Sequence, residues 1–166
     1  MLDIYTVSFF GHREISNGYA LEEKIEKLVK SLLNEKEYVD FLVGRHGEFD
    51  ILVSSVIKRV RKNYRSDNSS LTLYLPYESA EYRNGKEYFT EYFDSIEIFD
   101  GFHFKSAIYE CNKIMVDKSD LSVFFIERET GGAYKVYSYA IKNNRNVVVL
   151  YTKSPVISYG RLLVIF

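Results

Sequence analysis

Three short polar turns that contain glycine carry the residues best suited to bind an anion. Each follows an apolar run typical of a buried strand: residues 11–13 read Gly-His-Arg, residues 44–47 read Gly-Arg-His-Gly, and residues 128–132 read Arg-Glu-Thr-Gly-Gly. Below they are called the first, second and third turn. In an open parallel sheet, such turns lie at the carboxyl ends of the strands, where backbone amides and helix N-termini can hold an anion. We therefore expect one ligand site assembled from distant segments.

The first turn combines a flexible backbone with a cation. Gly11 permits a close turn, and Arg13 can hold a phosphate or carboxylate through two parallel, charge-assisted hydrogen bonds. His12 stands between them and is included in the predicted site. The alternative, that His12 and Arg13 are solvated loop residues with no role in binding, stays open.

The second turn opens a helix. Gly44 and Gly47 let the backbone approach a ligand, and we expect Arg45 or Asp50 to contact its sugar or base, with His46 nearby. Asp50 has two interpretations that both remain open. It could accept a hydrogen bond from a ribose hydroxyl, or it could be a first-turn carboxylate stabilised by the helix dipole.

The third turn is the best candidate for binding phosphate. Small residues at a helix start expose several unpaired N–H groups, and these residues are Thr130, Gly131, Gly132 and Ala133. We expect their amides to contact a phosphate together with the arginine of the first turn. The next residue, Tyr134, could stack on a base.

Other predicted site residues lie in different parts of the chain. Pro76 and Tyr77, at the end of a strand, belong to the predicted site, and Tyr77 is a second candidate for stacking on a base. Asn112 could hydrogen-bond a base or ribose, or could instead tie its helix to a loop. Glu127, at the end of the strand before the third turn, completes the predicted set.

The sequence contains no recognisable catalytic or metal-binding pattern. The three histidines, His12, His46 and His103, lack the paired spacing of zinc ligands, and Cys111 is the only cysteine. Its position on a helical core face predicts packing rather than nucleophilic chemistry. Serine-nucleophile and P-loop signatures are missing as well. We expect no catalytic residue, no metal and no cofactor apart from a nucleotide-like ligand.

Composition indicates an ordinary soluble protein of the cytoplasm. Of the 166 residues 46% are hydrophobic and 27% are charged, and the net charge is −1. Because the charges nearly cancel, the protein has no overall positive field to attract nucleic acid. We therefore expect nucleic acid to be an unlikely partner and a small anionic molecule, bound in a local pocket, to be the ligand. The lone cysteine fits a reducing compartment. No apolar run approaches the roughly 20 residues of a membrane span, and no leader pattern is present.

The spacing of apolar residues predicts alternating strands and helices. This order predicts an α/β fold: a Rossmann-like, doubly wound, mostly parallel sheet with helices on both faces, in a single domain over residues 1–166. Residues 155–166 could add an edge strand or an oligomerisation segment, and a homo-oligomer is expected. Residues 77–92 form an irregular connection with room for a short helix. The predicted strands are 4–10, 38–43, 71–75, 95–99, 121–127 and 147–151, and the predicted helices are 19–35, 49–60, 104–116 and 133–142.

Three segments together resemble the SLOG superfamily, the Rossmann-like group that unites Lonely Guy-type enzymes with DNA-processing Smf proteins. They read FFGHREI, FLVGRHGEFD and YECNKIMVDKSDLSVFFIERETGGAYKVYSYA, occur in the family's order and cover most of residues 4–151. They look most like its small single-domain bacterial members. The resemblance implies a nucleotide or nucleotide-derived ligand, such as an ADP-ribose-like or signalling nucleotide, with a role in antiviral defence or counter-defence.

Two departures from the family pattern bear on activity. The family's hydrolases share a PGGxGTxxE segment with a catalytic glutamate, whereas Tyr134 and Lys135 replace its Gly-Thr here and no glutamate follows. The usual Arg-Asn pair of the late helix is Cys111-Asn112. We therefore favour non-catalytic sensing or sequestration of a nucleotide. An N-glycosidase acting on nucleoside phosphates, with a carboxylate from Glu48, Asp50, Glu127 or Glu129, and an oligomeric interaction protein remain as alternatives.

Overall fold

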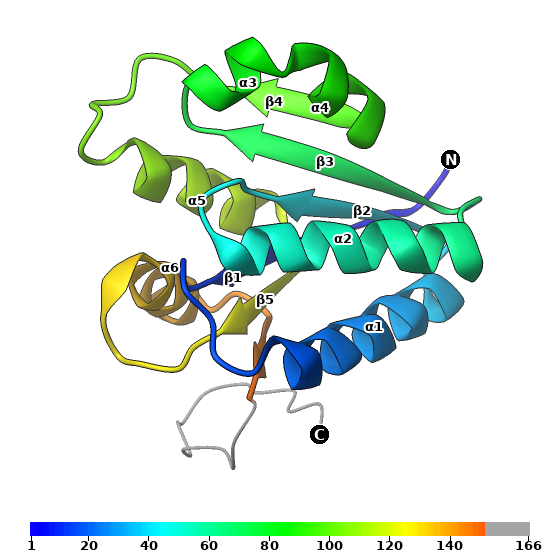
Figure 1. The fold of residues 1–166 in the computed structure, drawn as a ribbon. Helices are drawn as coiled ribbons and strands as arrows, with labels where there is room; N and C mark the ends of the chain where they lie inside the picture. Colours follow the sequence, from blue (N-terminus) through cyan, green and yellow to red (C-terminus); the bar gives the residue numbers. More distant parts are fainter. Residues whose placement is uncertain (152–166) are drawn as a thin grey trace.

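Six parallel strands form the centre of the computed structural model, which describes residues 1–151 (Figure 1). The predicted edge strand or oligomerisation segment at 155–166 lies outside the described residues. Each strand pairs in parallel with its neighbours in the order β4-β3-β2-β1-β5-β6. The strands are β1 (Ile4–Gly11), β2 (Tyr38–Val43), β3 (Ser69–Leu75), β4 (Ser95–Ile98), β5 (Leu121–Phe125) and β6 (Val147–Leu150).

The strand order places β1 at the point where the chain reverses its direction of travel across the sheet. From β1 the chain adds β2, β3 and β4 on one side, and it then returns to add β5 and β6 on the other. Gly11, at the end of β1, is level with Phe125 at the end of β5. The turns that follow these two strands therefore start side by side, at the position where open α/β sheets bind ligands.

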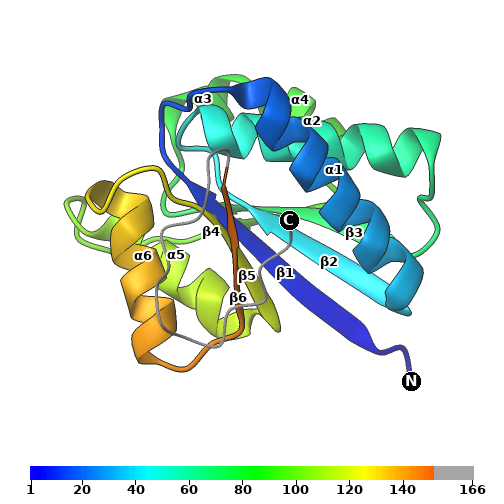
Figure 2. The ribbon, with the colours of Figure 1, turned by 90° about the horizontal axis from the view of Figure 1, so that it is seen from below.

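Helices cover both faces of the sheet, as Figures 1 and 2 show. Side chains of α1, α2, α3 and α4 pack on one face, and those of α5 and α6 pack on the other. The prediction of a doubly wound Rossmann-like fold is therefore confirmed. The helices are α1 (Gly18–Glu35), α2 (Glu48–Asn63), α3 (Ala80–Asn84), α4 (Lys86–Tyr92), α5 (Ala107–Lys118) and α6 (Gly131–Lys142).

The alternation of side chains along each strand builds two separate cores. In β1, Val7 and Phe9 pack under α1 and α2, whereas Phe10 packs under α5 and α6 and stacks on Phe124 at 5.0 Å between ring centroids. Both faces of the central strands are apolar because both are covered, which explains the uninterrupted hydrophobic runs in the sequence.

Some predicted boundaries shift by two or three residues next to the pocket-forming turns. α6 begins at Gly131 rather than at 133, β5 ends at Phe125 rather than at 127, and α5 begins at Ala107 rather than at 104. The region 77–92 contains two short helices, held by Tyr82 and Phe89, which are buried in the core under α2. Among residues 1–151, every helix is too short or too polar to cross a lipid bilayer.

Candidate functional site

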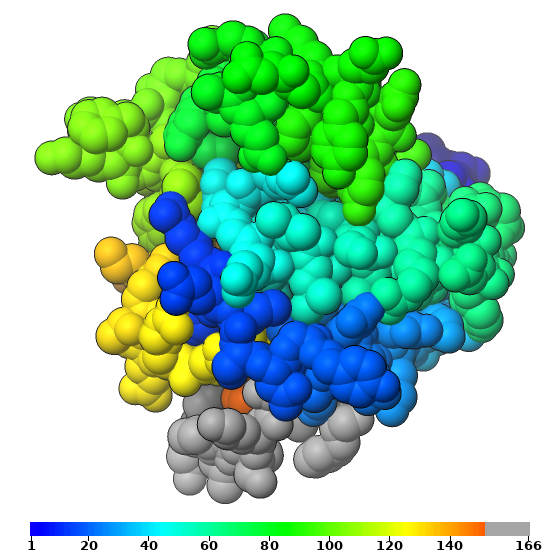
Figure 3. Space-filling view, viewed as in Figure 1, coloured from blue at the N-terminus to red at the C-terminus, as the bar shows by residue number. Residues whose placement is uncertain are grey.

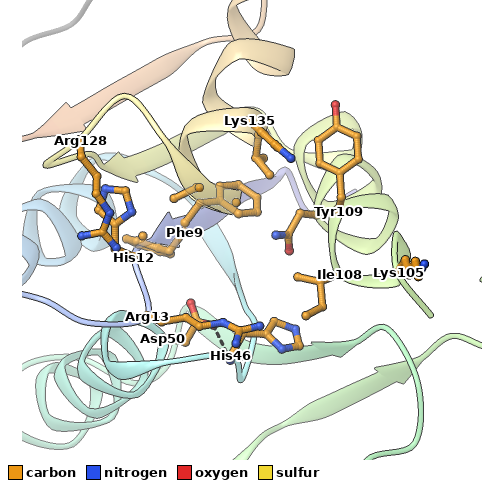
Figure 4. Close-up of a pocket in the computed structure, with 18 residues that line it drawn as sticks. Phe9, His12, Arg13, His46, Asp50, Lys105, Ile108, Tyr109, Arg128 and Lys135 are labelled. Atoms are coloured by element: carbon orange, nitrogen blue, oxygen red, sulfur yellow. Dashed lines mark hydrogen bonds between the residues drawn. The ribbon is translucent and has the colours of Figure 1, made fainter. Parts of the chain in front are cut away.

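The three turns meet around one pocket with a cavity volume of about 420 Å³, which lies within the range of small-molecule sites. Figure 4 shows Arg128 and Lys135 across the cavity from Asp50 and His46, with Arg13 of the first turn beside His46. The start of α5 forms a further wall. The predicted site residues that line the pocket are Gly11, His12, Arg13, Gly44, His46, Asp50, Asn112, Gly131, Gly132 and Ala133.

The backbones of the first and second turns touch, and glycine is what allows this. A Cβ atom at Gly47 would overlap the Cα of Arg13 and lie 2.9 Å from its carbonyl oxygen. That same oxygen accepts a hydrogen bond from the Glu48 amide at 2.8 Å, and the Ile15 amide donates to Glu48 Oε2 at 2.9 Å. Gly47 therefore does not contact the cavity, but it fixes the position of Arg13.

The first and third turns are joined by a buried histidine and a carboxylate. The Glu127 amide donates to His12 Nε2 at 3.0 Å, and the side chain and main-chain amide of Ser16 both donate to the Glu127 carboxylate. Burial lowers the pKa of His12, nearby Arg128 lowers it further, and Glu127 opposes the shift. The ring is therefore neutral at pH 7, with its proton on Nδ1 because Nε2 acts as the acceptor.

These contacts make one continuous surface from three segments. In Figure 3 the blue segment after β1 lies between the cyan start of α2 and the yellow segment before α6.

The N-terminus of α6 opens into the pocket without a cap. Thr130 provides no capping hydrogen bond, and the amides of Gly131, Gly132 and Ala133 have no acceptor within residues 1–151. Gly131 has a φ of 87°, which favours glycine. A Cβ at Gly131 or Gly132 would meet no atom within 4 Å. Free amides at the positive end of a helix are a suitable site for an anion.

The charges that line the pocket are mostly positive. Arg13, Lys105, Arg128 and Lys135 contribute cations, and none of them forms an ion pair with any residue in 1–151. Asp50 is the carboxylate that lines it. A chain with a net charge of −1 therefore gathers unpaired cations around one cavity.

Asp50 and His46 line the pocket side by side, and burial disfavours the charged form of each. The His46 amide donates to Asp50 Oδ2 at 2.8 Å. Burial raises the pKa of Asp50 to about 6, although the His46 hydrogen bond and Arg45 oppose the shift. Burial and the adjacent Arg13 lower the pKa of His46 to about 4, and its Nε2 has no partner within residues 1–151.

Several residues of the predicted site lie away from the pocket. Arg45 turns toward α3, where its guanidinium donates to Glu81 at 3.0 Å and lies 5.4 Å from the Phe89 ring. Tyr77 points into solvent from the end of β3, and the Glu127 carboxylate is occupied by its bonds to Ser16. The predicted residues that do not line the pocket are Arg45, Gly47, Pro76, Tyr77, Glu127, Thr130 and Tyr134.

Part of the pocket lining was not predicted from the sequence. Lys105, Ile108 and Tyr109 precede Asn112 by seven, four and three residues, so helical spacing from Asn112 could have found them. Arg128 and Lys135 flank the glycine pair and could have been selected as its neighbouring cations. The other missed residues form the apolar base of the cavity: Phe9, Phe10 and Val136.

The comparisons with known proteins bear on the fold. No family model and no curated protein matches the sequence. The structure resembles DNA processing protein A from Helicobacter pylori, with a TM-score of 0.63, 15% identity and coverage of 90% of this chain and 66% of that one. It also resembles DNA processing protein A from Streptococcus pneumoniae, with a TM-score of 0.63, 12% identity and coverage of 91% and 52%. The chain thus spans less than two thirds of either protein.

The prediction that nucleic acid is not a partner is wrong. The H. pylori protein, which shares this fold, has a described single-stranded DNA binding mode. The argument relied on net charge, but net charge averages over the whole surface. The cations of the pocket act locally, and the acidic residues that balance them lie elsewhere.

Proposed function

We propose that the pocket binds a nucleotide or nucleotide-derived signalling ligand through its phosphate and that the protein senses or sequesters this ligand without changing it. The observation that carries the proposal is the uncapped start of α6, whose free amides face a cavity lined by four unpaired cations. Phosphate is the anion that suits both donors, because it accepts several hydrogen bonds and carries enough charge to pair with more than one cation.

The placement of the carboxylates supports binding rather than hydrolysis. Glu48 and Glu127, two candidates for a catalytic carboxylate, are each bonded to main-chain amides of the segment after β1. Glu129 is exposed and does not line the cavity. Asp50 is therefore the remaining carboxylate for the alternative N-glycosidase, and base release is the outcome that would favour this alternative.

Single-stranded nucleic acid is a second candidate ligand. The H. pylori protein of the same fold binds single-stranded DNA, and a pocket built for phosphate can accept a phosphodiester as well as a free phosphate. We also propose that the chain is a cytoplasmic, single-domain protein of the SLOG superfamily. The shared Rossmann-like fold and the likeness to DNA processing proteins support this assignment.

Calorimetric titration of the purified protein with nucleoside mono-, di- and triphosphates and with a single-stranded DNA oligomer tests the proposal. Gly132→Asp places a carboxylate among the pocket cations at a position with open space, so we expect binding to be lost without loss of folding. Arg13→Ala should weaken binding at least several-fold, whereas Arg83→Ala, an exposed arginine on α3, should not. Chromatography of the ligand after incubation separates retention from hydrolysis. Equal binding by all variants would refute the site.

A further inference from the structure

Asp50 has one carboxyl oxygen that the fold uses and one that it does not. Oδ2 accepts the His46 amide at 2.8 Å, whereas Oδ1 has no hydrogen-bond partner within residues 1–151 and is not among their buried unpaired atoms. Figure 4 shows a carboxyl oxygen of Asp50 turned into the cavity. The pocket therefore contains a hydrogen-bond acceptor that faces the ligand space.

A structural role accounts for only half of this side chain. Asp50 lies in the first turn of α2, where Gly47 provides no capping side chain, and its bond to the His46 amide stabilises the start of the helix. Asparagine would make the same bond without burying a charge. Within residues 1–151 no cation forms an ion pair with Asp50, and the cost of burying its charge exceeds what the His46 amide and Arg45 return.

A carboxylate in a phosphate-binding pocket restricts what the ligand can place beside it. It repels the phosphate, which the free amides of α6 and the cations Arg128 and Lys135 attract to the wall across the cavity (Figure 4). The part of the ligand that reaches Asp50 must instead donate hydrogen bonds. On a nucleotide, the ribose hydroxyls are such donors, and in related α/β folds an acidic residue near the second strand accepts from the 2′-hydroxyl.

We propose that Asp50 accepts a hydrogen bond from the 2′-hydroxyl of the ligand's sugar and so selects ribonucleotides over deoxyribonucleotides. The inference rests on the proposed function, because it assumes that the phosphate lies at the start of α6. The same chemistry is offered by a free ribonucleotide and by single-stranded RNA, since both present a phosphate and a 2′-hydroxyl. Asp50 is thereby a specificity-determining residue of this pocket.

The test compares sugar pairs on the full chain. Ribonucleoside 5′-phosphates are titrated against their 2′-deoxy counterparts, and an RNA oligomer against the DNA oligomer of the same sequence. We expect a preference of about tenfold or more for the ribose form, the effect of a hydrogen bond to a charged group. Asp50→Asn keeps an acceptor for the His46 amide and should reduce that preference to about twofold or less. Asp3→Asn, which removes an exposed charge, should leave it unchanged.

The outcomes separate the inference from the function on which it rests. Equal binding of ribose and deoxyribose ligands by the native protein refutes the inference and leaves phosphate binding standing. A preference that survives in Asp50→Asn refutes it as well. Absence of binding by every ligand refutes the proposed function together with the inference. A preference for ribose that Asp50→Asn removes supports the inference in either arm. If it is seen with the mononucleotides, the ligand is a free ribonucleotide; if it is seen only with the oligomers, the ligand is single-stranded RNA.

Discussion

Replacing Asp50 with asparagine should stabilise the protein at neutral pH. Burial raises the pKa of this carboxyl from 3.8 to about 6, so the folded state binds its proton more tightly than the unfolded state does. Its contribution to stability therefore falls as the pH rises from about 4 to about 6 and stays low above that. At pH 7 the burial of the ionised Asp50 carboxylate therefore destabilises the folded state by about 3 kcal/mol, and asparagine, which carries no charge, removes this cost.

The neighbouring histidine makes the pH dependence of this effect diagnostic. Burial lowers the pKa of His46 from 6.5 to about 4, so its contribution to stability is present above pH 6.5 and is lost as the pH falls toward 4. In the native protein the two contributions oppose each other between pH 4 and pH 6. In Asp50→Asn the histidine acts alone, and the free energy of unfolding should rise by about 3 kcal/mol between pH 4 and pH 7.

Urea unfolding followed by circular dichroism at pH 4.5, 6 and 8 measures both effects. We expect the variant to be more stable than the native protein by about 1 kcal/mol at pH 4.5 and by up to about 3 kcal/mol at pH 8. This difference corresponds to a rise in Tm of roughly 6 to 12 °C for a chain of this size. A variant that is less stable at pH 8, or a difference that does not change with pH, would show that Asp50 is not destabilised by its burial.

Three further predictions concern the contacts that build the site. Gly47→Ala should lower the free energy of unfolding by about 1 to 3 kcal/mol, because its methyl group would overlap the Arg13 backbone; Gly132→Ala, in open space, is the control and should cost nothing. His12→Phe should cost about 1 to 3 kcal/mol, because the Glu127 amide loses its acceptor, and Glu127 should lose amide protection in hydrogen exchange. Cys111 is buried, and burial raises the pKa of its thiol to about 12, so a thiol reagent should modify it only after unfolding; rapid labelling of the native protein would contradict this.

The sequence was sufficient to predict where the strands and the turns lie but not which way the side chains in the turns point. A run such as Tyr38–Val43 is too short and too apolar for anything except a buried strand, and the structure has β2 at those residues. The turn that follows is also where it was predicted. Within that turn, however, His46 lines the pocket and Arg45 does not, because Glu81 and Phe89 of the 77–92 region hold the guanidinium.

The errors share a physical cause. The region 77–92 has no clear periodicity, so one short helix was predicted there instead of two, and the partner that they offer to Arg45 could not be foreseen. The same holds for Glu127, whose carboxylate is used by Ser16, a residue 111 positions away in the chain. Periodicity reports which face of an element is buried, whereas the choice of partner depends on contacts between distant segments.

The site has one part that tolerates little change and one that tolerates more. The first is the close contact between Gly47 and the Arg13 backbone, and the second is the start of α6 and the segment before α5. Because the backbones after β1 and β2 interlock, an insertion in either loop would disturb both, and natural variation there should be limited to side chains. A Cβ added at Gly131 or Gly132, at the start of α6, would meet no atom within 4 Å, and Lys105, just before α5, is exposed. Loops at those two places can change length or composition without unfolding the sheet. Engineering new ligand preferences into this scaffold should therefore begin at residues 128–135 and 102–109.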